Sequence, residues 1–270
     1  MTNQQFKVYT GRSDSREGAT NMIEFVILCS LGFLAALIDA IAGGGGLISL
    51  PALLLVGVPP HFALGTNKFA STTAALTSSL TFARSGKVHF PLVKWQIPFT
   101  LLGASLGVWS VLHISSDFLT KAVPILVLLV GLYTMFHKNL GLKENFQGLT
   151  FRNLLIGFIF AFAFGFYDGF FGPGTGSFLI FAFITVYGFD FIVSSANAKV
   201  LNFVSNLVSL VLFALSGKIL YTYGIPMALF MLLGSRVGTR LAIRKGSRLV
   251  KPIFITMSLL VAAKLIYQAL

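Results

Sequence analysis

The sequence predicts an all-α membrane protein, a polytopic helical bundle built from two homologous repeats. Hydrophobic residues make up 56% of the chain and charged residues only 10%, whereas soluble domains carry about a quarter charged residues. The mean hydropathy is +0.86. Apolar runs of about 20 residues, long enough to cross a bilayer as helices, recur along most of the chain. Because these runs are continuously apolar, we expect helices and not alternating barrel strands.

Eight clear apolar segments and two shorter ones are predicted. The clear segments are residues 22–42, 67–84, 91–113, 118–137, 152–171, 190–215, 221–239 and 252–269, and the short ones are 47–57 and 176–188. Residues 1–21 mix charged and small polar residues without an apolar core, so we expect a flexible polar tail and no signal peptide. Cys29 is the only cysteine, which excludes a disulfide within the chain.

The second half of the chain repeats the first. Asp39 and Gly43 recur as Asp168 and Gly172, at an offset of 129 residues. Beyond the Gly cluster the offset is 131, and it matches Gly57 with Gly188, Lys68 with Lys199, Ser85–Val88 with Ser216–Ile219, Gly103 with Gly234 and Gly107 with Gly238. Such self-similarity indicates two copies of one unit. We therefore assign residues 22–137 to a first membrane repeat, 138–151 to a connecting loop and 152–270 to a second membrane repeat.

The charges in the loops favour two copies of opposite orientation. Basic residues gather in three loops: Arg84, Lys87 and Lys94; Lys138, Lys143 and Arg152; and Arg240, Arg244, Lys245, Arg248 and Lys251. Loops rich in Lys and Arg stay in the cytoplasm. All three loops are cytoplasmic if the N-terminus lies outside and both short runs cross. This predicts ten crossings in a five-plus-five inverted repeat, with half-helices or broken helices at the short runs.

Asp39 and Asp168 are two of only eight acidic residues, and they lie at matched positions inside apolar runs. A carboxylate within a membrane is costly and needs a reason. One reason is a proton or cation relay in a cavity lined by protein. The other is structural: each carboxylate could accept hydrogen bonds from freed backbone N–H groups and cap the next half-helix. The sequence leaves both open.

The Gly clusters predict breaks in the membrane helices. Four glycines occupy 43–46, and Gly172, Gly174 and Gly176 follow Asp168. Each Gly costs a helix about 1 kcal/mol relative to Ala. A broken membrane helix lines a cavity, and the N-termini of its halves favour an anion. By contrast, the spacing of Gly103 with Gly107 and of Gly234 with Gly238 indicates close helix packing.

Lys68 and Lys199 open the third segment of each copy and are candidates to bind an anion or to pair with an aspartate. The alternative is a lysine that reaches to the membrane interface, which we favour more for Lys68 than for Lys199. Amide side chains accompany them. The candidate site contains Asp39, Gly43, Gly44, Gly45, Gly46, Asn67, Lys68, Asp168, Gly172, Gly174, Thr175, Asn197, Lys199 and Asn202.

Other kinds of function find little support. The net charge of +12 reflects basic loops and scarce acids, so no nucleic-acid partner is expected. The four histidines lie singly, without metal-ligand spacing, and the Gly clusters lack the pattern of a phosphate-binding loop. We expect neither an enzyme nor any cofactor or metal.

The residues just described resemble the sulfite exporter TauE/SafE family. The resemblance rests on Asp39, Gly43–Gly46, Pro51, Thr66–Lys68 and the block Gly165–Ser177, and extends over residues 22–270. It implies a bacterial cytoplasmic-membrane permease for sulfur-containing anions such as sulfite or organosulfonates, without bound nucleotide. Substrates vary within the family.

Together these observations predict a secondary transporter for a small anion, with protons as an optional coupling ion. An anion channel on the same scaffold and a non-transporting membrane subunit are the alternatives. The expected partners are the anion and the lipid bilayer, and a homo-oligomer is left open.

Overall fold

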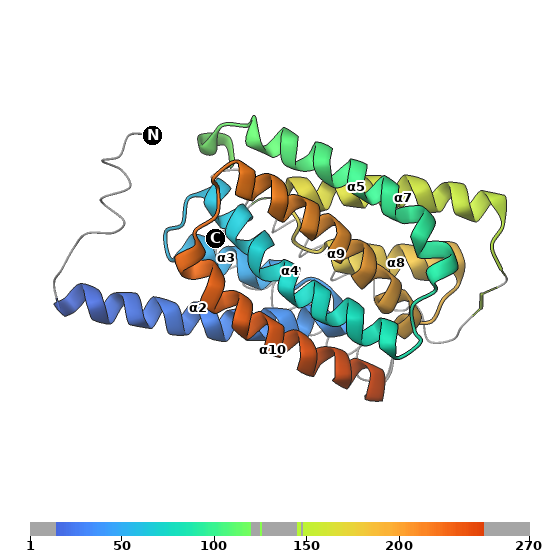
Figure 1. Cartoon of the computed structure of the whole chain (residues 1–270), viewed down its shortest axis with the longest axis horizontal. Helices are drawn as coiled ribbons and strands as arrows, with labels where there is room; N and C mark the ends of the chain where they lie inside the picture. The colour runs from blue at the N-terminus through green and yellow to red at the C-terminus, as the bar shows by residue number, and fades with distance from the viewer. Residues whose placement is uncertain (1–14, 120–124, 126–144, 147, 246–270) are drawn as a thin grey trace.

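The computed structural model describes residues 15–119, 125, 145–146 and 148–245 (Figure 1). Within these residues the structure is helical, and it contains no strand. The helices are α2 (Ser15–Ala42), α3 (Gly46–Leu55), α4 (Pro60–Arg84), α5 (Phe90–Leu112), α7 (Phe151–Phe170), α8 (Thr175–Tyr187), α9 (Phe191–Leu215) and α10 (Tyr221–Lys245). The predicted segment 252–269 and most of 118–137 lie outside the described residues.

Two helices begin earlier than hydropathy predicts. α2 begins at Ser15, so the end of the tail expected at 1–21 is helical. α4 begins at Pro60, before the boundary expected at residue 67. Proline suits the first position of a helix because its missing N–H would have no partner there. α2 opens with polar residues that the prediction assigned to the tail, whereas α4 opens with residues 60–64, a mostly apolar stretch that the prediction left outside the segment 67–84.

α2 and α7 both end at a Gly cluster, as predicted. Gly43 and Gly44 have φ angles of 74° and 94°, and Gly172 and Gly174 have φ angles of 99° and 85°. Glycine adopts this left-handed region without steric cost. The helices that follow, α3 and α8, have 10 and 13 residues. They are about 15 and 20 Å long, shorter than the roughly 30 Å hydrocarbon core.

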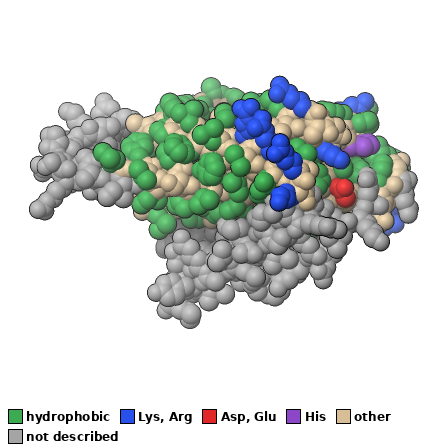
Figure 2. All heavy atoms as spheres, turned by 90° about the horizontal axis from the view of Figure 1, so that it is seen from below, with side chains coloured by type: hydrophobic (Ala, Val, Ile, Leu, Met, Phe, Trp, Pro, Cys, Tyr) green, Lys and Arg blue, Asp and Glu red, His purple; other side chains and the backbone are tan. Residues whose placement is uncertain are grey.

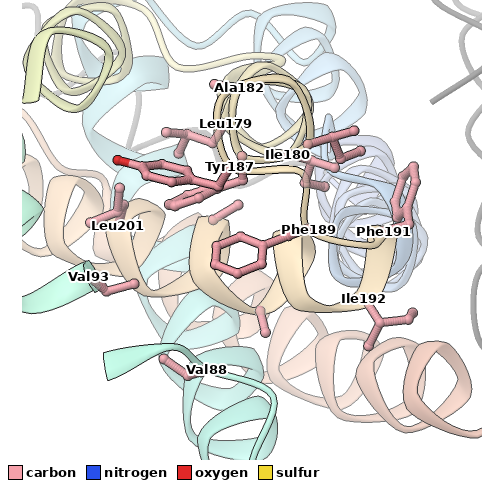
Figure 3. Packing of buried hydrophobic residues seen from close by; sticks show 14 of the residues in the cluster. Val88, Val93, Leu179, Ile180, Ala182, Tyr187, Phe189, Phe191, Ile192 and Leu201 are labelled. Carbon is pink, nitrogen blue, oxygen red and sulfur yellow. The ribbon is translucent and has the colours of Figure 1, made fainter. Parts of the chain in front are cut away.

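Each short helix is buried in its own hydrophobic cluster. Leu47, Leu50 and Leu53 of α3 pack in the first cluster, together with residues of α4 and α10. The second cluster surrounds α8, and Figure 3 shows Leu179 and Tyr187 of this helix in its packing with Phe189 and Leu201. Both Gly clusters are therefore anchored on their C-terminal side by a buried helix.

Close packing joins α5 of the first repeat to α7 of the second. A Cβ atom on Gly103 would collide with the carbonyl oxygen of Phe162, and one on Gly107 with that of Phe166. The backbones can approach this closely only because no side chain intervenes, which confirms the packing role predicted for this pair of glycines. The contacting residue numbers increase in the same direction along both helices, so α5 and α7 run parallel.

The equivalent packing joins α10 of the second repeat to α2 of the first. A Cβ atom on Gly234 would collide with the carbonyl oxygen of Phe33, and one on Gly238 with that of Leu37. These residues match the previous contacts at the repeat offsets, with the repeats exchanged. α2 and α10 therefore also run parallel, and Figure 1 shows them pointing opposite to α5 and α7.

The outer surface is largely apolar. Figure 2 shows hydrophobic side chains over much of one face, with Lys and Arg side chains gathered toward one end. Four described helices contain segments long and apolar enough to cross a membrane, namely Phe25–Ala42, Phe90–Leu112, Phe151–Phe170 and Phe191–Leu215. α4 and α10 are also 25 residues long but more polar.

Candidate functional site

The two Gly clusters meet at the centre of the bundle. A Cβ atom on Gly43 would collide with the backbone of Gly176 and Ser177, and one on Gly46 would lie 2.9 Å from Cα of Pro173. The Ser177 hydroxyl donates a hydrogen bond to the carbonyl oxygen of Ala42 at 3.3 Å. The N-termini of α3 and α8 therefore converge, and each presents backbone N–H groups and a positive dipole end.

Asp39 lies at the start of the first break and has two kinds of partner. Lys199 Nζ is 2.5 Å from Asp39 Oδ2, and the lysine side chain is 0% exposed whereas the aspartate side chain is 21% exposed. The backbone N–H of Gly45 donates to Asp39 Oδ1 at 3.1 Å. Asp39 thus supports the N-terminus of α3, as the structural alternative predicted, and also carries an ion pair.

Asp168 holds the corresponding position in the second repeat and is more deeply enclosed. Lys68 Nζ is 2.9 Å from Asp168 Oδ1, and both side chains are 2% exposed. The Ser205 hydroxyl donates a short hydrogen bond to Asp168 Oδ2. The Lys68 side chain is therefore buried in an ion pair with an aspartate and does not extend to the surface of the bundle. It lies about two turns inside α4, which begins at Pro60.

The two ion pairs cross between the repeats. Asp39 and Lys68 belong to the first repeat, whereas Lys199 and Asp168 belong to the second. In the alignment of the two halves, Asp39 matches Asp168 and Lys68 matches Lys199. Replacing each residue of one ion pair by its match therefore gives the other ion pair. The two ion pairs are therefore reciprocal with respect to the sequence alignment of the two halves.

A pocket lies between the ion pairs and the converging half-helices. Its lining residues are Asp39, Gly44, Gly45, Gly46, Asn67, Lys68, Ser71, Ala74, Asp168, Gly172, Gly174, Gly176, Asn202, Asn206 and Met231. The structure therefore brings together most of the predicted site residues. Asn67 is buried, and its Oδ1 atom has no hydrogen-bond partner among the described residues. This leaves a polar atom free for a ligand or a water molecule.

Four predicted residues do not line the pocket. Lys199 acts on it through Asp39. Gly43 and Thr175 shape the breaks, and the Thr175 hydroxyl donates to the carbonyl oxygen of Gly172 at 2.7 Å. Asn197 lies elsewhere, where its Oδ1 accepts the backbone N–H of His89 at 2.8 Å.

The candidate set omitted some residues for which the sequence held a signal. Ser71, which lines the pocket, stands at the position that matches the predicted Asn202, each three residues after a site lysine. Ser205 does not line the pocket but donates to Asp168, and it follows Asn202 by three residues, so both lie on one face of α9. Met231 carried no signal, because nothing in the sequence shows that α10 reaches the pocket. No group of His, Cys, Asp and Glu that could hold a metal ion occurs in the described part.

One family model and several membrane transporter proteins match the chain. The model of the sulfite exporter TauE/SafE family matches residues 28–265. A probable membrane transporter protein of Haemophilus influenzae is 43% identical, covering 90% of this chain and 94% of the relative. The probable membrane transporter protein YfcA of Escherichia coli K12 is 38% identical over 90% of both chains. A third, from Sinorhizobium sp., is 36% identical over 92% of this chain and 94% of the relative. No solved structure matches.

Proposed function

Because the chain belongs to the sulfite exporter TauE/SafE family of membrane transporters, we propose that it is a secondary transporter for a small anion. One observation carries the proposal: two half-helix N-termini converge on a pocket that also contains a buried lysine. Half-helix N-termini facing a central pocket favour anionic groups in secondary transporters. The ammonium group of Lys68, which is paired with Asp168, lines the same pocket.

The proposed substrate is a sulfur oxyanion or an organosulfonate. Support comes from the name of the family and from the donors around the pocket, which are backbone N–H groups, a lysine and three asparagines. Such donors surround the several oxygens of an oxyanion, which accept hydrogen bonds from many directions. We further propose proton coupling through the paired carboxylates, since each can change its charge during a transport cycle.

The proposed architecture is a multi-pass inverted repeat in the bacterial cytoplasmic membrane. α2 and α10 run opposite to α5 and α7 (Figure 1), which supports a two-fold axis perpendicular to the helices. The exchanged ion pairs and exchanged glycine contacts support the same axis. In this arrangement the substrate lies at the interface of the repeats, and rocking of one repeat against the other gives alternating access.

Transport by purified protein in liposomes tests the proposal. Vesicles would be loaded with sulfite, thiosulfate, a sulfonate or a carboxylate, and anion flux, current and internal pH would be recorded together. A carrier gives saturable flux of a sulfur-containing anion that responds to a proton gradient. Large currents without saturation would indicate a channel, and no flux of any anion would leave only a non-transporting role.

A further inference from the structure

The two matched carboxylates differ in their surroundings. Both carboxylates line the pocket, and each accepts one hydrogen bond besides that of its lysine: Asp39 from the backbone N–H of Gly45, and Asp168 from the Ser205 hydroxyl. Asp39 is 21% exposed, whereas Asp168 is 2% exposed. A carboxylate that changes its protonation state must be reached by water, and Asp39 meets this condition better than Asp168 does.

The sequence encodes a further difference. Ser205, which donates to Asp168, stands at the position that Ala74 occupies in the first repeat, at the offset of 131 residues. Ala74 lines the pocket, and its side chain has no group that could donate to Asp39. A difference in side chains persists whichever way the transporter faces. The two carboxylates therefore have different neighbouring side chains in every conformation of the transport cycle.

Charge balance limits what the pocket can accept. The charged side chains facing Asp39 are Lys199 from α9 and, across the pocket, Lys68 from α4 and Asp168 from α7. From α3, α8 and α10 the pocket receives only glycines and a methionine. The formal charges of two lysines and two aspartates sum to zero. The N-termini of α3 and α8 add only partial positive charges. A bare anion would therefore bring a full negative charge into a buried site without a counter-ion, which is unfavourable.

We infer that Asp39 is the exchangeable proton site, and that the pocket takes one monovalent anion together with one proton. This inference rests on the proposed anion transport. A proton from water adds to the Asp39 carboxylate, while Lys199 stays an ammonium ion that has lost its counter-ion. The site then carries one positive charge, which a single negative charge on the anion neutralises. Release of both ions restores the original ion pair.

Two anions of similar size and different charge test this stoichiometry. Methanesulfonate carries one negative charge at any working pH, and sulfate carries two. Uptake into liposomes would be measured with the membrane potential set by potassium and valinomycin. We expect methanesulfonate to enter with one proton, at a rate independent of the potential, and at least about tenfold faster than sulfate. Methanesulfonate uptake driven by the potential, or faster sulfate uptake, would overturn the inference.

Variants of the two carboxylates test the assignment. Asp39→Asn resembles the protonated state, so we expect it to retain exchange of methanesulfonate while proton uptake per anion falls at least about tenfold. Asp168→Asn and Ser205→Ala should keep a ratio near one proton per anion, whatever happens to the rate. If Asp168→Asn lost the coupled proton uptake while Asp39→Asn kept it, the assignment would be reversed.

The outcomes separate this inference from the proposed function. No uptake of either anion by the wild-type protein would count against anion transport itself. Uptake with a different ratio of protons to anions would leave transport standing and remove only the inference. Since the wild-type ratio and its dependence on potential need no variant, a variant that fails to fold does not weaken the test. Size-exclusion chromatography and the melting temperature would identify such a variant.

Discussion

Lys68 and Lys199 are almost completely buried, although lysine is among the residues least often found inside proteins. Each is tolerated because a carboxylate lies within ion-pair distance. We expect the two ion pairs to have different roles. Asp168 is enclosed and held by a serine, which suits a fixed joint between repeats, whereas the exposure of Asp39 suits a pair that opens.

Lys68→Met should destabilise the protein by about 3–5 kcal/mol, because it leaves the Asp168 carboxylate buried without a counter-ion. Thermal unfolding in detergent would measure the change. The double variant Lys68→Met/Asp168→Leu should recover most of the loss, since it removes both charges. A double variant less stable than the single variant would contradict the view that the unpaired charge is the cause.

Lys199→Ala should weaken the apparent affinity for a transported anion at least about tenfold, because the positive charge that remains when Asp39 is neutral is lost. The affinity follows from the anion concentration that raises the melting temperature of the purified protein. Lys94→Ala is the matched control, since Lys94 is an exposed lysine beside Trp95. An unchanged affinity in Lys199→Ala would remove Lys199 from the site.

Among the helices, α4 shows most clearly what hydropathy misses. Its buried face carries Thr66, Asn67 and Lys68, and these polar residues lower the hydropathy where the helix is most enclosed. A membrane helix whose polar face meets other helices looks like a loop in a hydropathy profile. By contrast, the breaks at the Gly clusters were predictable because glycine acts on the local backbone, whatever the helix packs against.

Glycine-mediated packing of α5 on α7 and of α10 on α2 predicts a matched pair of variants. Gly103→Ala and Gly234→Ala should each destabilise the protein by about 1–3 kcal/mol, because each new methyl group collides with a carbonyl oxygen of the opposite repeat. Leu102→Ala, at a side chain that is 60% exposed on α5, is the control and should have little effect. Similar melting temperatures for all three variants would contradict close packing at both interfaces.

For the whole molecule, the repeat and its residue offsets were predictable from sequence, because they depend only on matching positions. The pairing of Asp39 with Lys199 was not. Nothing local shows whether a lysine meets the aspartate of its own repeat or of the other, since that depends on how the repeats dock. The sequence predicted that each lysine binds an anion or pairs with an aspartate. Only the three-dimensional contacts show which aspartate each lysine meets.

The proposed orientation makes Lys245 cytoplasmic. A cysteine introduced there, in a Cys29→Ala background, should react with a membrane-impermeant maleimide only after the cells are opened. A cysteine at Lys87 should behave in the same way, because both residues are exposed and lie in basic parts of the sequence. Labelling of either position in intact cells would overturn the five-plus-five inversion.

The crossed ion pairs also bear on how the chain is made. Asp39 meets a lysine 160 residues further along the sequence. At the usual speed of synthesis, about 5–20 residues per second, the aspartate is made roughly 8–30 s before its partner. During that interval Asp39 and Lys68 lack the partners that they have in the folded protein, and the glycine surface on α5 is not yet covered by α7. We therefore expect the central ion pairs to form only after the second half has been made.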